Sequence, residues 1–84
     1  MNDKPKILYV DDEELNITVF RLTFSKVFEV LTADSGDKGM EIFSSDPDIK
    51  FVISDMRMPA MNGLEFIRKI RNVCAHTPCS ILSG

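Results

Sequence analysis

The chain has 84 residues, the size of one small domain. Its 44% hydrophobic and 27% charged residues exclude a disordered chain, and no apolar run approaches the roughly 20 residues that a membrane-spanning helix needs. The net charge of −3 argues against a nucleic-acid-binding domain, because such a domain carries a basic face.

The chain begins with a strand and a helix. Residues 6–10, KILYV, form a short continuous apolar run, which is typical of a strand buried on both faces of a parallel sheet. The next segment predicts a helix with an acidic first turn and a broad apolar face. That face consists of two stripes at helical spacing: Leu15, Val19 and Leu22, then Ile17, Phe20 and Phe24.

The middle of the chain repeats this alternation. Residues 28–33 predict a second strand, and the turn-forming residues 34–36 close it. Met40 and Phe43 indicate a short second helix that stops before residues 46–47, because the residue before a proline disfavours helical geometry. Residues 51–54, FVIS, predict the third strand.

A third helix and a fourth strand follow. Asn62 and Glu65 have the spacing of a capping box, which predicts a helix from about Gly63 to Arg71. Its expected buried face consists of Phe66, Ile67, Ile70 and Val73. Residues 78–83 form the fourth predicted strand. Strands that alternate with helices in this way predict an α/β fold with a parallel sheet and right-handed crossovers.

Three carboxylates follow two of these strands. Asp11 and Asp12 come after the first strand, and Asp55 comes after the third. Parallel strands place their carboxyl ends at one edge of the sheet, so the three side chains converge if the two strands are neighbours. Like charges ~4 Å apart repel by about 4 kcal/mol at an effective dielectric of 20, so either one carboxyl is protonated or a cation lies among them. Such oxygen ligands suit Mg²⁺, and an aspartate beside it can attack a phosphoryl group.

These residues carry a resemblance to a known family. Residues 10–13, VDDE, together with residues 55–63, DMRMPAMNG, resemble the receiver domain of two-component response regulators. The turn at residues 33–36 and the segment Leu82-Ser83-Gly84 are also similar to that family. The resemblance covers the chain from Lys6 onward. It implies a CheY-like, flavodoxin-like doubly wound parallel sheet with strand order 2-1-3-4.

The resemblance also implies roles for individual residues. Asp55 matches the phosphoacceptor, which takes a phosphoryl group from a histidine kinase in a Mg²⁺-dependent step of phosphorelay signal transduction. Asp12 matches a direct Mg²⁺ ligand, Asp11 a partner that acts through a water, and the backbone carbonyl of Arg57 the remaining protein ligand. Ser83 matches the hydroxyl that contacts the phosphoryl group and moves on activation.

The chain also departs from the family pattern. Residues 1–84 correspond to a (βα)₃β portion of a (βα)₅ receiver, without the fourth helix, the fifth strand and its lysine, and the fifth helix. We therefore expect a truncated chain, or a short form that dimerises. The fourth strand is expected to be an open edge, and an apolar patch is expected on the side of the first helix.

The expected partners are a histidine kinase or phosphotransfer protein, and an output domain or a second copy paired along the fourth strand, with no nucleic acid and no membrane. The alternative function is a receiver-like module that acts by self-association or partner binding without phosphotransfer. A phosphatase with an aspartyl nucleophile is disfavoured, because Arg57 stands where its second aspartate would be. The chain is thus expected to be a phosphoacceptor rather than a turnover enzyme. We expect it to be cytoplasmic, with Cys74 and Cys79 reduced.

Overall fold

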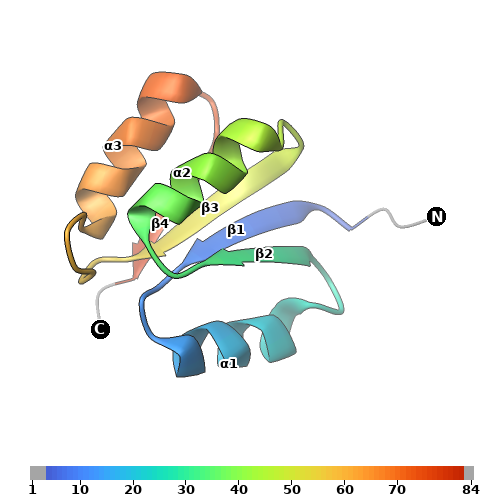
Figure 1. Cartoon of the computed structure of the whole chain (residues 1–84). Helices are drawn as coiled ribbons and strands as arrows, with labels where there is room; N and C mark the ends of the chain where they lie inside the picture. Colours follow the sequence, from blue (N-terminus) through green and yellow to red (C-terminus); the bar gives the residue numbers. More distant parts are fainter. Residues whose placement is uncertain (1–3, 83–84) are drawn as a thin grey trace.

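Strands and helices alternate along the whole of the described chain. The computed structural model describes residues 4–82. Its elements are β1 (Lys6–Val10), α1 (Glu14–Phe24), β2 (Glu29–Ala33), α2 (Gly36–Ser45), β3 (Ile49–Asp55), α3 (Gly63–Val73) and β4 (Cys79–Leu82). All three strand pairs are parallel and the order is β2-β1-β3-β4, which is the flavodoxin-like arrangement expected from the sequence. Helices α2 and α3 cover one face of the sheet and α1 the other (Figure 1).

The register of the strands decides which residues meet at the carboxyl edge. Val10 at the end of β1 lies opposite Ala33 of β2 and Ser54 of β3. On the other side of β3, Asp55 lies opposite Leu82 of β4. The residues that follow Val10 and Ser54 therefore emerge side by side, and both are aspartates.

Successive residues of β1 point to opposite faces of the sheet and serve two separate cores. Leu8 and Val10 are fully buried under α2 and α3, in a cluster that includes Val52, Phe66 and Ile70. On the other face, Ile7, Tyr9 and Phe20 form a smaller cluster under α1. There the rings of Tyr9 and Phe20 stack at a centroid distance of 4.1 Å. The smaller cluster matters for function because Tyr9 lies two residues before Asp11, the first of the aspartates at the carboxyl edge.

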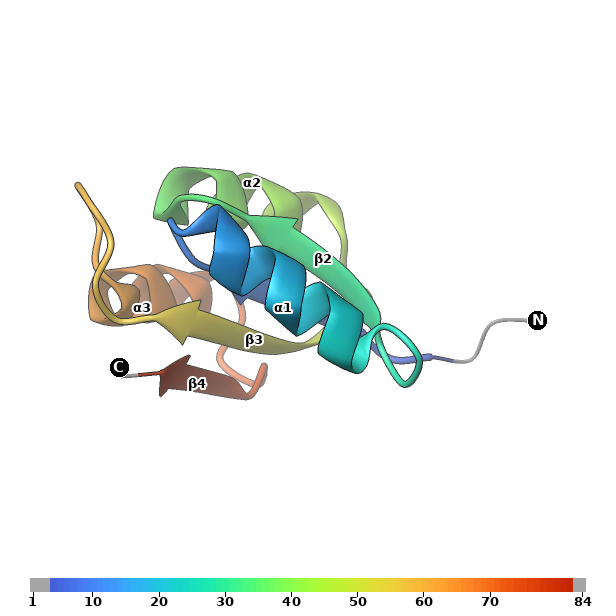
Figure 2. The same cartoon turned by 90° about the horizontal axis from the view of Figure 1, so that it is seen from below.

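Only one of the two apolar stripes of α1 packs inward. Phe20 is buried and Ile17 is partly buried, whereas Leu15, Val19 and Leu22 are 71%, 54% and 76% exposed. The broad apolar face expected from the sequence is therefore only partly buried. Figure 2 shows the reason: α1 lies over β1, and no helix within residues 4–82 covers β3 and β4 on that side.

The resulting apolar patch is the one expected from the sequence. It forms a groove between α1 and the uncovered strands. The groove is lined by Tyr9, Leu15, Val19, Phe20, Phe24 and Leu82, with Asp11 and Asp55 at one end.

The third helix begins as its sequence predicts. The Asn62 side chain accepts a 2.9 Å hydrogen bond from the Glu65 N–H, and Glu65 Oε1 accepts one of 3.2 Å from the Asn62 N–H. The capping box is thus confirmed. Phe66 and Ile70 are fully buried, but Val73 is 56% exposed, so including it in the buried face was wrong. Val73 is the last residue of α3.

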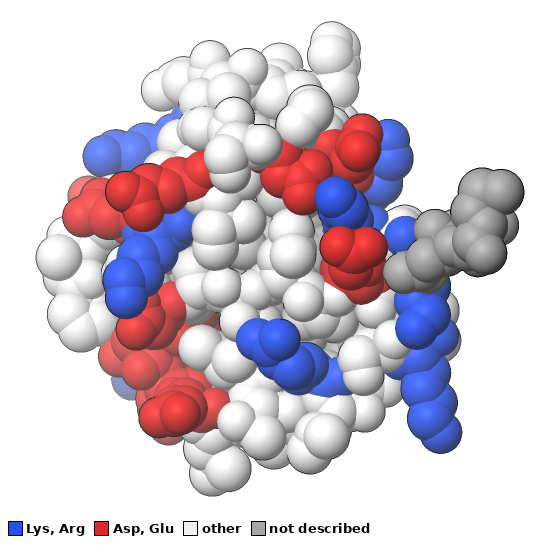
Figure 3. Space-filling model, turned by 45° about the vertical axis from the view of Figure 1, so that its right-hand side comes forward, with Lys and Arg blue, Asp and Glu red and all other residues white. Residues whose placement is uncertain are grey.

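Two surface properties bear on the classes of partner. None of the helices within residues 4–82 has the length and apolarity needed to cross a bilayer. Acidic side chains gather along the left side of the face shown in Figure 3.

Candidate functional site

Three carboxylates converge at the carboxyl edge of the sheet. Asp11 and Asp12 lie in the turn between β1 and α1, and Asp55 is the last residue of β3. One ligand oxygen from each lies within 4.8 Å of the others. Asp11 is buried, Asp55 is partly buried and Asp12 is exposed. The convergence predicted from the sequence is confirmed, because β1 and β3 are neighbours with Val10 aligned to Ser54.

Asp11 is fixed by the protein itself. Its Oδ2 accepts hydrogen bonds from the Tyr9 hydroxyl at 2.6 Å and from Asn16 Nδ2 at 3.1 Å. Its Oδ1 accepts one from the Glu13 N–H at 2.9 Å. Since a carboxylate has about four acceptor positions, these three donors leave room for about one more partner.

Tyr9 is a site residue that the sequence analysis did not identify. Burial, followed by the hydrogen bond to Asp11 and the nearby negative charges, raises the pKa of the Tyr9 phenol. The hydroxyl therefore stays protonated and donates to Asp11 at neutral pH. A signal was present: residues i and i+2 of a strand share a face, and Asp11 follows the strand directly, so continuing the alternation by one residue places Tyr9 and Asp11 on the same side.

The loop after Asp55 is held tightly against the strand. The Met56 N–H donates to the Leu82 carbonyl at 3.1 Å, and the Gly63 N–H donates to the Met56 carbonyl at 2.9 Å. A Cβ on Gly63 would lie 2.4 Å from the Asp55 carbonyl oxygen, so only glycine fits. These contacts keep Asp55 at the rim and start α3 directly beside it.

Two methionines anchor the middle of this loop. Met58 and Met61 are buried in the larger core, whereas Pro59 and Ala60 between them are exposed. The Met61 N–H donates to the Pro59 carbonyl at 2.7 Å, which closes a tight turn at Ala60 with φ of 67°. The methionines therefore act as packing residues.

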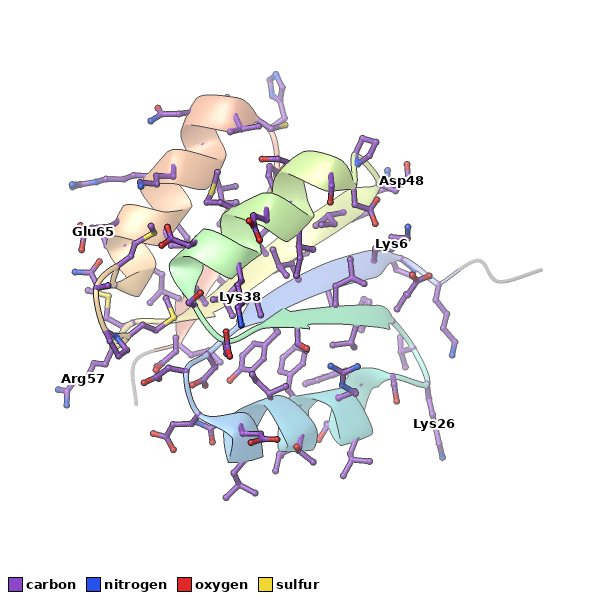
Figure 4. The ribbon with its side chains drawn as sticks, viewed as in Figure 1. Lys6, Lys26, Lys38, Asp48, Arg57 and Glu65 are labelled. Atoms are coloured by element: carbon purple, nitrogen blue, oxygen red, sulfur yellow. The ribbon has the colours of Figure 1, made fainter. Side chains whose placement is uncertain are left out.

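The roles predicted for the other two site residues, Arg57 and Ser83, are not tested by the structure. Arg57 follows Asp55 by two positions, and its side chain is exposed and points away from the sheet (Figure 4). The ligand role expected of its backbone carbonyl stays a prediction. Ser83 lies outside the described residues, so its predicted contact with a phosphoryl group also stays a prediction.

A cation lies near the acidic edge on the β2 side. Lys38 extends from the first turns of α2 and lines a shallow depression together with Asp12 and Asp34 (Figure 4). Its ammonium group lies 3.2 Å from the Asp34 carboxylate. Both partners are exposed, so this pair contributes little to stability. Lys6, by contrast, lies at the opposite end of the sheet.

Comparison with known proteins identifies the family. The model of the response regulator receiver domain matches residues 7–84. The chain belongs to the response regulator receiver domain family. This receiver domain is 35% identical over 69 residues to a two-component response regulator, ORR3, of Oryza sativa subsp. indica, covering 81% of the chain and 53% of that protein. It thus spans about half the length of that relative.

Another relative, a sensor kinase, and two solved structures of receiver proteins are also similar to this chain. The autoinducer 1 sensor kinase/phosphatase LuxN of Vibrio campbellii is 29% identical over 84 residues, which is 99% of the chain and 10% of LuxN. A receiver domain protein from Clostridium thermocellum superposes with a TM-score of 0.91 at 36% identity, over 94% of this chain and 64% of that one. A receiver protein from Pseudomonas putida gives 0.89 at 28% identity, over 100% and 71%.

The donor set of this receiver domain fits a magnesium ion. The three side chains supply only oxygen ligands, and at least one of them, Asp12, faces solvent. Mg²⁺ prefers such oxygens and keeps several waters when it binds to one or two carboxylates. A cation here would also relieve the repulsion among the three carboxylates.

Proposed function

We propose that this receiver domain accepts a phosphoryl group on Asp55 from the phosphohistidine of a histidine kinase or phosphotransfer protein, in a step that depends on Mg²⁺. One observation carries the choice of Asp55. Asp11 is held by three protein donors, whereas no donor within residues 4–82 is hydrogen-bonded to the carboxylates of Asp12 and Asp55. Of these two, only Asp55 lies in the segment that resembles the phosphoacceptor motif of the family. Asp55 thus keeps a free oxygen at the rim of the sheet.

The transfer replaces one bond to phosphorus by another. An Asp55 carboxylate oxygen bonds to phosphorus while the P–N bond to the donor imidazole breaks, and the nitrogen keeps the electron pair. Asp12, Asp55 and the Arg57 carbonyl would hold the ion, and Asp11 would orient one of its waters. Bound there, Mg²⁺ offsets negative charge on the phosphoryl oxygens. Ser83, outside the described residues, is the proposed hydroxyl contact to the phosphoryl group.

In this role the domain is a phosphoacceptor rather than a turnover enzyme. Each Asp55 carries one phosphoryl group until water or another acceptor removes it. The signal is the conformational change that accompanies the added charge, since a phosphoryl group brings strong acceptor oxygens to the rim. We also place the domain in the cytoplasm, where reduced thiols such as its two free cysteines persist.

The test is the intact mass of the protein after incubation with acetyl phosphate and Mg²⁺. The expected result is a gain of one phosphoryl group, absent in Asp55→Asn and in a sample with excess chelator. Asp12→Asn should keep the fold and slow the gain at least tenfold. An unmodified mass for a wild-type protein that is folded by circular dichroism and binds Mg²⁺ would refute the phosphoacceptor role for this chain.

A second copy of the chain is a further proposed partner. On one side β4 pairs with β3, and within the described residues its other edge has no neighbouring strand. Leu82 is 46% exposed beside the groove along α1, so edge pairing would also bury apolar surface. Sedimentation over a range of concentrations should reveal a dimer that Ile81→Lys weakens. A monomer at every concentration would refute this pairing.

A further inference from the structure

One asparagine of this chain, Asn62, is followed directly by a glycine. Asparagine is thermally labile, because the backbone nitrogen of the next residue can attack its carboxamide carbon, and a glycine has no side chain to hinder that attack. The pair lies where the loop after Asp55 joins α3, with Asn62 as the N-terminal cap of that helix. Asn62 is only partly buried and lines a surface depression with Met56 and Pro59, so water reaches it.

The folded loop holds both reacting groups in hydrogen bonds. The backbone nitrogen of Gly63 is the nucleophile, and its N–H donates to the Met56 carbonyl at 2.9 Å. The Asn62 carboxamide oxygen accepts the Glu65 N–H at 2.9 Å, and the Asn62 N–H donates to Glu65 Oε1 at 3.2 Å. The attack requires the Gly63 nitrogen to lose its proton and the carboxamide to turn toward it. These bonds must therefore open first, which makes local opening of the loop the route to the reaction.

Both neighbours of Asn62 are fixed by packing. A Cβ on Gly63 would clash with the Asp55 carbonyl oxygen, so the backbone at the end of β3 encloses this glycine. On the other side, Met61 is buried in the larger core, and its sulfur packs so closely on Gly36 of α2 that a Cβ there would also clash. The closed loop thus has no room for an additional main-chain atom between positions 61 and 63.

The capping role of Asn62 separates the two products that its reaction gives. Aspartate caps a helix as well as asparagine does, and its charge suits the N-terminal end of the helix dipole. Conversion of Asn62 to aspartate therefore leaves the capping box in place. Isoaspartate, by contrast, lengthens the main chain by one CH₂ group. That group has to fit exactly where Met61 and Gly63 leave no room.

We propose that Asn62 is a deamidation site that reacts in the folded protein when the loop beside Asp55 opens, and that the isoaspartate formed there prevents the loop from closing again. In the first step the Gly63 nitrogen bonds to Cγ of Asn62, and the carboxamide nitrogen leaves as ammonia with the proton that Gly63 loses. In the second step water opens the cyclic imide, at Cγ to give aspartate or at the main-chain carbonyl to give isoaspartate. One asparagine and one water thus give one acidic residue and one ammonia.

The test follows the whole chain at mildly alkaline pH, folded in buffer and unfolded in guanidinium chloride. Intact mass reports the replacement of NH₂ by OH, peptide mapping locates it, and an isoaspartyl methyltransferase counts isoaspartate in the digest. Asn62 should convert in the unfolded chain and about a hundredfold more slowly in the folded one, because opening breaks two or three hydrogen bonds. Asn72, which precedes a valine, is the internal reference and should convert far more slowly than Asn62 in the unfolded chain. No readout uses phosphorylation at Asp55, so the proposal is tested separately from the proposed function.

Variants separate the opening of the loop from its consequence. Glu65→Ala removes the carboxylate that holds the Asn62 N–H, so Asn62 in the folded protein should convert severalfold faster. Arg68→Ala, on the exposed side of the same helix, is the matched control and should leave the rate unchanged. Asn62→Asp should melt close to the wild type, because aspartate also caps the helix. The isoaspartate form, isolated by chromatography, should melt at least about 5 °C lower.

Three results would overturn the proposal. One is conversion of Asn62 at the same rate in the folded and the unfolded chain, which would mean that the loop does not hold the reacting groups. The second is a Glu65→Ala protein that converts no faster than Arg68→Ala. The third is an isoaspartate form that melts at the same temperature as Asn62→Asp. Since the first comparison uses the wild type alone, a variant that fails to fold does not weaken the test.

Discussion

The Tyr9 hydroxyl donates a 2.6 Å hydrogen bond to Oδ2 of Asp11, from a ring that is stacked on Phe20. This bond joins the smaller core to the acidic edge. Packing of the Tyr9 ring under α1 therefore determines where the Asp11 carboxylate lies. The site depends on a side chain that does not itself offer an oxygen to the proposed ion.

Replacing Tyr9 by phenylalanine should weaken both stability and ion binding. The variant keeps the stacked ring but leaves the buried Asp11 carboxylate without one donor, which costs about 1–3 kcal/mol. Mg²⁺ affinity should fall about tenfold, because Asp11 is no longer oriented. Urea denaturation and a Mg²⁺ titration followed by calorimetry measure the two effects. Asn16→Ala removes an exposed donor to the same oxygen and should have a smaller effect, so equal effects would argue against a special role for Tyr9.

Removing one charge from the acidic edge should stabilise the metal-free protein. In the presence of a chelator, Asp55→Asn should raise the free energy of unfolding by about 1 kcal/mol, because it relieves repulsion with Asp11 and Asp12. Added Mg²⁺ should then stabilise the wild type more than the variant. Urea denaturation with and without Mg²⁺ measures both. Glu41→Gln, which removes an exposed charge on α2, should show neither effect, and a variant less stable than the wild type in chelator would contradict the prediction.

An alanine at position 63 should destabilise the loop beside Asp55. Its Cβ would meet the Asp55 carbonyl oxygen at 2.4 Å and the Met56 Cα at 3.0 Å, both parts of the backbone. Since neither atom can move without disturbing β3, we expect a loss of about 2–3 kcal/mol in urea denaturation. Arg68→Ala, on the exposed side of the same helix, should change stability by less than about 0.5 kcal/mol. Similar stability of the two variants would show that the loop backbone can shift to accept the added Cβ at little cost in stability.

A glycine at position 60 should have the opposite effect. Ala60 has a φ of 67°, which costs a residue with a Cβ about 1–2 kcal/mol. Glycine relieves that strain but gains freedom in the unfolded chain, so the net stabilisation should be up to about 1 kcal/mol. Thermal unfolding measures it. Ala75→Gly is the matched control, because Ala75 is exposed and has no positive φ; it should destabilise slightly. A lower melting temperature for Ala60→Gly would contradict the strain argument.

The ion pair between Lys6 and Asp46, 2.9 Å apart at the opposite end of the sheet, should give a defined pH dependence. The hydrogen bond from Lys6 lowers the pKa of Asp46, and the same bond raises the pKa of Lys6. A lowered carboxyl pKa stabilises the fold above the ordinary aspartate value of about 3.9, and this contribution is lost as the pH falls further. A raised lysine pKa stabilises the fold below about 10.4 and is lost as the pH rises.

Asp46→Asn should therefore be less stable than the wild type by a constant amount between about pH 5 and 9, with the difference closing outside that window. Urea denaturation across the pH range provides the measurement. Asp48→Asn serves as the control, because the bond that Asp48 makes to Asp46 uses its backbone N–H. A difference that stays constant down to pH about 2 would show that Asp46 acts through something other than its charge.

The strands and the acidic edge could be predicted from the sequence because each of them depends on a local feature of the chain. Apolar runs mark β1 and β3. Asp11 comes directly after β1 and Asp55 is the last residue of β3, so the parallel order brings the two aspartates together. The Asn62–Glu65 box likewise needs only local spacing. Periodicity could not tell which stripe of α1 faces the core, because Leu15 and Phe20 are both apolar. That choice depends on how far α1 reaches across the sheet, which no local pattern encodes.

The central place of β1 has a consequence for how the chain assembles. It is synthesised before the other strands of the sheet, yet its second neighbour, β3, lies on the order of forty residues further along. Leu8 and Val10 cannot be enclosed before β3 has been synthesised and a long loop has closed, which makes docking of β3 a slow, late event in folding. Asp11 and Asp55 meet in that same event. A nascent chain therefore acquires its acidic site no earlier than its core.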